Sequence, residues 1–395
     1  MNGAAPLAPL EVAGRLDRLR ALLDRAGADG RPVDGLLVTN ATSIRWLSGF
    51  TGSAGLLLVT GDHALLTSDG RYRTQALEQL SAVGVDADIE IRIGGVHAQR
   101  EALVVESGAI RSLGLEADHV TWSAQRSWDD LFVGIELLAT RGLVEGLRMA
   151  KDAGEVARME CAAAIADEAL ADVLPLLAAA GSGTGGTLTE SRFAAALDHA
   201  MRERGAEDRA FETIVASGEN SAKPHARPGD RPIGVGDPVV VDFGAVFDGY
   251  RSDMTRTFWV GGTPSGGMAE VFAVVAASQR AGVDAVAPGA VAGSVDQVCR
   301  EVIASSGWAD RFEHGTGHGV GLEIHEGPSV GPGSTAILVP GTVVTVEPGV
   351  YLPGTGGVRI EDTLVVTENG SRSLTQFPKE VAVRWPSRPT ISAMA

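Results

Sequence analysis

The sequence predicts two domains of different fold class, an α/β domain over residues 1–147 and an α+β domain over residues 148–395. Three observations lead to this prediction. A chain of 395 residues is longer than one ordinary hydrophobic core supports. In the first part, short apolar runs alternate with helical patterns, as in an α/β domain with a mixed sheet. In the second part, helical patterns come first and strand patterns dominate beyond residue 210, so helices and strands are partly segregated.

The first domain opens with an amphipathic helix over residues 12–26. Its apolar positions recur at helical spacing: Val12, Leu16, Leu19, Leu22 and Leu23. Three strands follow over residues 35–39, 55–59 and 63–67, because each is a short apolar run bounded by Gly or Asp. Further helix and strand patterns alternate up to about residue 139.

The second domain begins near residues 147–152 with a long helix over residues 154–180, which a glycine-rich loop over 181–186 ends. Thr187 and Glu190 have the spacing of a capping box, which predicts a second helix running to about residue 204. Two more helices are predicted among the later strands, over residues 268–286 and 294–305.

Composition places the chain among soluble globular proteins, with 44% apolar and 21% charged residues. The formal charge of −17 and the lack of a basic block exclude nucleic acid as a partner. No apolar run approaches the roughly 20 residues that span a bilayer, and no secretory signal opens the chain. Cys161 and Cys299 lie far apart without a CxxC spacing, which indicates buried thiols and a cytoplasmic protein.

Acidic residues interrupt three strand patterns of the second domain where apolar residues are expected. The turn at Asp248-Gly249 predicts a hairpin that presents two of them from adjacent strands. Asp248 and Asp362 are interpreted as solvated or turn residues. The four acids that remain are Asp242, Asp253, Glu347 and Glu361.

A lone ionised carboxylate in such surroundings costs several kcal/mol unless a cation neutralises it. Four converging carboxylates would also repel one another, and divalent cations, which prefer oxygen ligands, resolve both problems. Each acid taken alone also fits a solvent-facing position on an edge strand.

Half of the eight histidines lie in two short segments near these acids in the sequence, and interleaved glycines let the backbone pass close to a site. They are His225, His314, His318 and His325. One imidazole with four carboxylates is typical of a two-metal hydrolytic centre. His63, His97, His119 and His199 have no such context and are interpreted as surface or structural residues.

At these residues the sequence closely resembles the pita-bread metallopeptidases, a family that includes methionine aminopeptidase, prolidase and aminopeptidase P. The resemblance covers roughly residues 150–375. Beside the spaced pair Asp242 and Asp253, it is carried by the segments His314-Gly-Thr-Gly-His318, Val346-Glu-Pro-Gly349 and Arg359-Ile-Glu-Asp362. It implies five metal ligands: Asp242, Asp253, His318, Glu347 and Glu361.

The first part of the chain resembles the creatinase-type N-terminal domain of aminopeptidase P and prolidase, in Ser-Gly-Phe-Thr-Gly-Ser-Ala-Gly over residues 48–55 and Asp-Gly-Arg-Tyr over 69–72. The predicted architecture is therefore an α+β pita-bread catalytic domain preceded by a smaller α/β creatinase-type domain. This domain and Arg359, just before Ile360-Glu361, resemble the proline-specific branch rather than methionine aminopeptidase.

The resemblance also implies roles at the site. Glu347 would bind metal and shuttle the proton of a hydroxide that bridges the two metal ions. His225 and His325 would contact the substrate and stabilise the tetrahedral intermediate. His314 would line the pocket for the proline ring, and Arg359 would organise the metal-bound carboxylates or hold the substrate.

The function implied is that of a homodimeric Xaa-Pro aminopeptidase that needs two divalent ions, manganese or else cobalt. It would act on peptides with proline at the second position. One alternative left open is an Xaa-Pro dipeptidase (prolidase) restricted to dipeptides. A remote alternative is a non-catalytic peptide-binding module on the same fold. Creatinase shares the scaffold but works without metal, so the intact ligand set argues against it.

Overall fold

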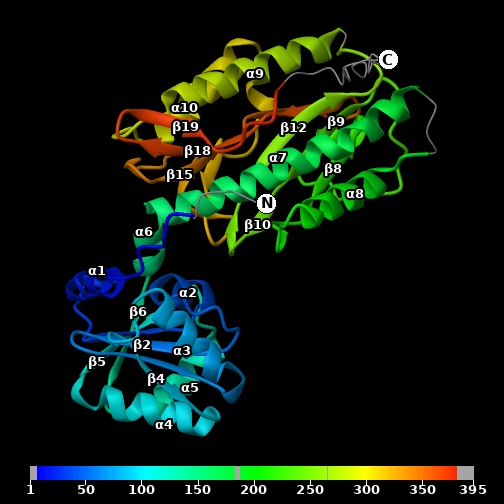
Figure 1. Cartoon of the computed structure of the whole chain (residues 1–395). Coiled ribbons are helices and arrows are strands. Elements are labelled where there is room, and N and C mark those ends of the chain that lie inside the picture. Colours follow the sequence, from blue (N-terminus) through cyan, green and yellow to red (C-terminus); the bar gives the residue numbers. More distant parts are fainter. Residues whose placement is uncertain (1–6, 183–186, 265, 380–395) are drawn as a thin grey trace. The chain divides into compact units, whose positions relative to one another are not determined.

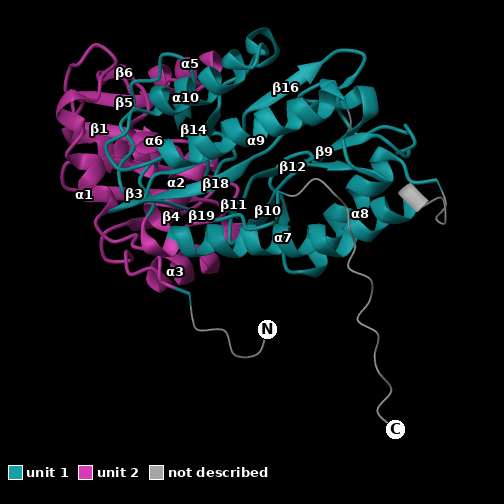
Figure 2. Ribbon diagram, turned by 90° about the horizontal axis from the view of Figure 1, so that it is seen from above, with its two compact units in different colours: residues 1–7, 149–151, 155–395 teal, residues 8–148, 152–154 magenta. Residues whose placement is uncertain are grey.

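A computed structural model describes residues 7–182, 187–264 and 266–379, which form two compact units (Figure 2). The smaller unit comprises residues 8–148 and 152–154. The larger unit takes the remaining described residues, almost all of them beyond residue 154. Within the described ranges, no helix is both long and apolar enough to cross a membrane.

The smaller unit is built on one six-stranded mixed sheet, which confirms the predicted α/β class. The strand order is β4-β3-β2-β1-β5-β6. The β1/β2 and β2/β3 pairs are antiparallel, whereas β1/β5, β3/β4 and β5/β6 are parallel. The strands are β1 (Gly35–Val38), β2 (Gly55–Thr60), β3 (Ala64–Ser68), β4 (Glu90–Ile93), β5 (Ser112–Glu116) and β6 (Glu136–Thr140). The helices are α1 (Arg15–Arg20), α2 (Ala41–Ser48), α3 (Arg73–Ala82), α4 (Val96–Glu106), α5 (Trp122–Leu131) and α6 (Leu143–Arg148).

The first helix is shorter than its apolar pattern predicts. Gly14 has a φ of 82°, a left-handed conformation that cannot continue a helix, so α1 starts only at Arg15. After Arg20 the chain continues as a 3-10 turn at Leu23–Arg25. Val12, Leu16, Leu19 and Leu23 are nevertheless buried, as the pattern predicted, whereas Leu22 is exposed.

The larger unit places strands between two pairs of helices, as Figure 1 shows. The helices α7 (Ala153–Ser182) and α8 (Glu190–Glu203) share one hydrophobic core with β8, β9 and β12. The helices α9 (Gly267–Ala285) and α10 (Ala292–Ser305) share a second core with β14, β15, β16, β17 and β18. This is the pita-bread arrangement that the sequence predicted.

The strands of the larger unit form small antiparallel sheets. Their orders are β12-β9-β8, β11-β10-β7, β14-β13-β15-β18-β19 and β16-β17. The strands of the first part are β7 (Asp208–Arg209), β8 (Ile214–Ser217), β9 (Pro238–Phe243), β10 (Ala245–Phe247), β11 (Tyr250–Arg251) and β12 (Met254–Trp259). Those that follow are β13 (Gly317–Gly319), β14 (Glu326–Val330), β15 (Val343–Val346), β16 (Gly349–Leu352), β17 (Gly356–Arg359), β18 (Asp362–Thr367) and β19 (Gly370–Ser373).

The predicted capping box at the start of α8 is wrong. Thr189 is the N-cap, and its hydroxyl oxygen accepts from the Arg192 amide. Glu190 instead accepts from the backbone amide and hydroxyl of Ser217, 2.7 and 2.8 Å away, and from the Gly229 amide. Its carboxylate therefore holds the two ends of the loop that carries His225. Of the predicted glycine-rich loop over 181–186, residues 181 and 182 belong to α7 and 183–186 lie outside the described residues.

Candidate metal centre

Four acids and one imidazole from five strand ends surround one cavity of about 340 Å³. β9, β12 and β15 are buried along almost their whole length, and the candidate acids stand at or next to the ends of these strands. Asp242 lies on β9, Asp253 directly before β12, His318 on β13, Glu347 directly after β15 and Glu361 directly before β18.

The hairpin that presents the first two acids has the predicted turn. Asp248 has a φ of 43° and Gly249 of 71°, and the two residues join β10 to β11. The chain then returns along β9, with Met254 opposite Phe243 and Thr255 opposite Asp242. Asp253 is therefore brought close to Asp242.

Ligand atoms at the cavity lie within reach of one cation. His318 Nε2 is 3.5 Å from Asp253 Oδ2 and 3.5 Å from Glu347 Oε1. Asp253, His318 and Glu361 each offer an atom within 4.8 Å of the others. Asp242 Oδ1 is buried and has no hydrogen-bond partner within the described chain. A buried carboxylate oxygen without a donor is stabilised when a cation binds it.

The buried carboxylates also disturb one another's ionisation. Burial, and after it the charge of neighbouring acids, raises the pKa of Asp253 and Glu361 well above the ordinary range. Burial also raises the pKa of Glu347 to about 8, although Arg359 opposes the shift. The protein supplies too little positive charge for these acids, and a divalent cation would supply the rest.

His318 has the protonation state of a metal ligand. Its Nδ1 lies 3.0 Å from the carbonyl oxygen of Gly319, which can only accept, so Nδ1 carries the proton. Burial, followed by repulsion from His325, lowers the pKa of His318 to about 4 and keeps the ring neutral. Nε2 therefore presents a lone pair to Asp253 and Glu347. The residues fit a divalent cation, because the donors are four carboxylates and one neutral imidazole.

Arg359 supports the acids from behind the cavity, whose lining does not include it. The side chain is buried, and its Nη2 donates to Asp242 Oδ2 at 2.6 Å. Its Nη1 donates to the hydroxyl of Tyr351 at 2.9 Å. Arg359 therefore contacts one of the candidate ligands directly, and its role in the site stays a prediction.

His314 also lies outside the lining of the cavity, with both ring nitrogens occupied. Its Nε2 is 2.8 Å from the Tyr351 hydroxyl, and its Nδ1 is 2.8 Å from the Gly315 carbonyl oxygen. Because Arg359 can only donate to Tyr351, the tyrosine proton points to His314 Nε2, and Nδ1 carries the histidine proton. Burial lowers the pKa of His314 to about 4, which agrees with a neutral ring.

The other two histidines face the cavity directly. His225 and His325 line it together with the acids, and the His325 ring lies 4.4 Å from that of His318, centroid to centroid. Part of the remaining wall is apolar and includes Phe211, Ile214 and Ile324, and Glu212, Thr213 and Arg227 line the cavity as well. The cavity thus combines a charged end with a partly apolar wall.

Two residues near the site were misread or missed from the sequence. Asp362 is buried, at 2% exposure, and not the solvated residue that was expected. Tyr351 was not singled out, although a tyrosine in the apolar strand directly after Val346-Glu-Pro-Gly349 was a usable signal.

A second group of possible ligands lies in the smaller unit, where His63 Nε2 is 3.2 Å from Glu90 and 3.3 Å from Glu106. All three side chains are about one-third exposed. This matches the interpretation of His63 as a surface residue.

Comparison with known proteins gives two family matches and several similar full-length chains. Residues 157–368 match the profile of metallopeptidase family M24, and residues 15–150 match the creatinase/prolidase N-terminal domain. An Xaa-Pro dipeptidase structure from Bacillus anthracis superposes with a TM-score of 0.86 at 37% identity, covering 94% of this chain and 99% of the other. An X-Pro aminopeptidase structure from Thermotoga maritima gives 0.79 at 34% identity, covering 89% and 98%. The Xaa-Pro dipeptidase of Pyrococcus furiosus is 33% identical over 368 residues, which are 93% of this chain and 99% of the relative.

Proposed function

Because the chain belongs to metallopeptidase family M24, we propose that it is an Xaa-Pro dipeptidase, which hydrolyses the bond before proline in dipeptides. The observation that carries the proposal is the convergence of four acids and one neutral imidazole on a cavity whose wall is partly apolar. The similarity to the Bacillus anthracis dipeptidase over nearly the whole length of both chains supports the specificity. The comparisons favour this alternative over the aminopeptidase that the sequence first suggested.

The cofactor of the proposed enzyme is a pair of divalent cations, manganese or else cobalt. Asp242, Asp253, His318, Glu347 and Glu361 would hold them. Bound there, such cations would lower the pKa of a water molecule and neutralise charge that develops on the substrate. We also propose the homodimer that the family resemblance implies, which size-exclusion chromatography with light scattering would test.

The residues of the chain would perform the remaining steps. Glu347 lines the cavity and would take a proton from the attacking water, then pass it to the proline nitrogen that leaves. His225 and His325 would donate hydrogen bonds to the oxygen of the scissile carbonyl as it becomes negative. The Xaa-Pro bond is a tertiary amide without an N–H. A site that offers no acceptor to the scissile amide therefore leaves no donor of this substrate unpaired.

The apolar wall would receive the proline ring. Phe211, Ile214 and Ile324 offer an apolar surface beside the charged end of the cavity. Burying a small ring there gains roughly 25 cal/mol per Å² of apolar area. A flexible or charged residue after the scissile bond gains less, which would favour proline.

The test compares Ala-Pro, Ala-Pro-Ala and Ala-Leu as substrates for chelator-stripped protein, each with and without added manganese. The proposal predicts manganese-dependent release of proline from Ala-Pro and little turnover of the other two peptides. Fast release of alanine from Ala-Pro-Ala would instead establish the second candidate, an Xaa-Pro aminopeptidase, which the Thermotoga maritima similarity supports. Turnover of Ala-Leu at the rate of Ala-Pro would refute proline specificity altogether.

A further inference from the structure

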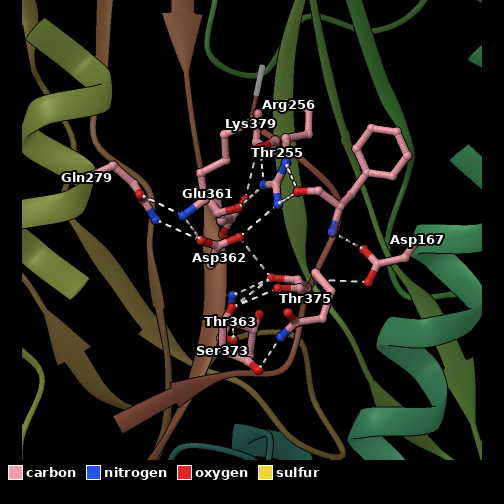
Figure 3. A network of polar contacts seen from close by, with 12 residues as sticks. Asp167, Thr255, Arg256, Gln279, Glu361, Asp362, Thr363, Ser373, Thr375 and Lys379 are labelled. Atoms are coloured by element: carbon pink, nitrogen blue, oxygen red, sulfur yellow. Dashed lines mark hydrogen bonds and ion pairs between the residues drawn. The ribbon is translucent and has the colours of Figure 1, made fainter. Parts of the chain in front are cut away.

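The carboxylate of Asp362, the residue after Glu361, has four hydrogen-bonding or ionic partners among the side chains of the protein (Figure 3). Its Oδ1 accepts from Arg256 Nη2 at 2.8 Å and from the Thr375 hydroxyl at 3.0 Å. Its Oδ2 accepts from Gln279 Nε2 at 3.0 Å and contacts the ammonium of Lys379. Asp362 does not line the cavity, and both of its carboxylate oxygens are occupied, whereas Asp242 Oδ1 in the cavity has no partner within the described chain. Its charge is balanced by two cations of the chain.

Arg256 connects Asp362 to the backbone of Glu361. The side chain is buried, and its Nη1 donates to the carbonyl oxygens of Thr255 and Glu361. The Thr255 hydroxyl donates to Glu361 Oε2 at 2.7 Å, and the Glu361 amide donates to the Thr255 carbonyl oxygen at 3.1 Å. Glu361 is therefore held at its amide, its carbonyl and its carboxylate.

Residues 374–379 close this network from the far end of the described chain. They contain no helix or strand, so their position depends on individual contacts. Arg256 Nε and Nη2 donate to the Phe377 carbonyl oxygen at 3.0 and 2.6 Å. Asp167 on α7 accepts from the amides of Gln376 and Phe377 at 2.7 and 3.1 Å. We call residues 374–379 the strap.

The strap joins elements that are far apart in the sequence. The Phe377 ring packs edge-on against Phe258 of β12, with centroids 6.2 Å apart. The Lys379 ammonium donates to Gln279 Oε1 of α9 at 3.0 Å in addition to its contact with Asp362. The same few residues thus bind α7, β12, α9 and β18 directly behind Glu361.

We propose that Lys379 and Asp362 are positioning residues: the strap fixes the geometry of Glu361 through Asp362 and Arg256, and thereby the affinity of the candidate centre for divalent cations. This inference rests on the proposed function, in which Glu361 binds metal. Two observations make Lys379 a suitable position at which to test this inference. Lys379 is 38% exposed, so its removal spares the core, and it contacts no residue that lines the cavity in the described chain.

The experiment measures manganese affinity by calorimetric titration of chelator-stripped protein, beside the thermal unfolding of the same metal-free samples. The variants are Lys379→Met and Asp362→Asn, with Lys379→Arg as the conservative rescue. Arg372→Met is the matched control, because Arg372 on β19 pairs with Glu160 on α7 at the surface and does not contact Asp362. The titration of wild-type protein measures cation binding in the absence of any peptide substrate.

We expect Lys379→Met to weaken manganese binding about twofold to fivefold, the scale of one partly exposed charge contact. Asp362→Asn should weaken it more, Lys379→Arg should restore it, and Arg372→Met should leave it unchanged. Loss of thermal stability in Lys379→Met with unchanged affinity would overturn the inference and leave the strap a purely structural feature. So would tighter binding, which simple removal of a positive charge near the cations would produce. Wild-type protein that binds no divalent cation would instead overturn the proposed function, and the inference with it.

Discussion

The neutral state of His314 makes a quantitative prediction about stability and pH. In the folded chain, burial lowers the pKa of His314 to about 4, against an ordinary value of 6.5. The unfolded chain therefore binds a proton at a higher pH than the folded chain does. The stability that His314 contributes is complete above pH 6.5 and is lost as the pH falls toward 4.

The magnitude follows from the difference between the two pKa values. Lowering the pH from about 7 to about 4.5 should cost the larger unit about 2 kcal/mol through this one residue. The nearby acids oppose the effect, because the raised pKa of Asp253 and Glu361 makes the folded chain bind protons earlier than the unfolded chain. A comparison of two proteins that share these acids cancels that contribution.

The assay is urea unfolding of wild type and His314→Gln at both pH values, with the metal removed. Glutamine keeps an acceptor for the Tyr351 hydroxyl but has no proton to gain. We expect wild type to lose about 2 kcal/mol more than the variant does between the two pH values. An equal loss in the two proteins would refute the neutral, Nδ1-protonated His314 and the direction of the hydrogen bonds through Tyr351 and Arg359.

Three further predictions concern the site. Glu347→Ala should abolish hydrolysis of Ala-Pro while circular dichroism stays unchanged, and near-normal turnover with excess manganese would contradict the role of Glu347. Arg359→Lys keeps the charge but removes the planar guanidinium, whose two Nη atoms donate to Asp242 and Tyr351 at the same time. We therefore expect kcat/KM, measured in steady state, to fall about 10- to 100-fold. An unchanged kcat/KM would show that the two hydrogen bonds from Arg359 are dispensable. Glu190→Gln should lower the free energy of unfolding by about 1–3 kcal/mol, because the new amide group would face the Gly229 N–H donor. Urea unfolding at constant pH measures this change, and a variant as stable as wild type would contradict the prediction.

The fold class was predictable because hydrophobic pattern decides it. The runs in β1, β2 and β3 of the smaller unit are short, apolar and bounded by glycine or aspartate, and the structure places each within one residue of its prediction. The helices of the larger unit were equally clear. The length of α1 was not, because a pattern of buried positions does not reveal that Gly14 is left-handed.

The four candidate acids could be named because each interrupts an apolar strand pattern, and the resemblance to the metallopeptidases added His318 from a glycine-rich segment. Partners from distant parts of the chain could not be named in the same way. Glu190 has the spacing of a local cap, but its carboxylate binds Ser217, 27 residues further along. Asp362 resembles a solvated residue beside Glu361 until Arg256, 106 residues earlier, is placed against it. Such roles depend on tertiary contacts that no local pattern encodes.

His314 illustrates the same limit within a recognised motif. The segment from His314 to His318 pointed to both histidines, yet His318 lines the cavity whereas His314 bonds to Tyr351 behind it. The difference is set by β16, which carries Tyr351 and pairs with the strand that ends at Arg359. Sequence spacing alone does not show which of two nearby rings turns toward the site.

The proposed metal centre is tested by a crystal structure of the protein grown with manganese, with anomalous scattering recorded to locate the metal. We expect anomalous peaks in the cavity, bound by Asp242, Asp253, His318, Glu347 and Glu361. An empty cavity at saturating manganese, or peaks only at the group of His63, Glu90 and Glu106, would contradict it.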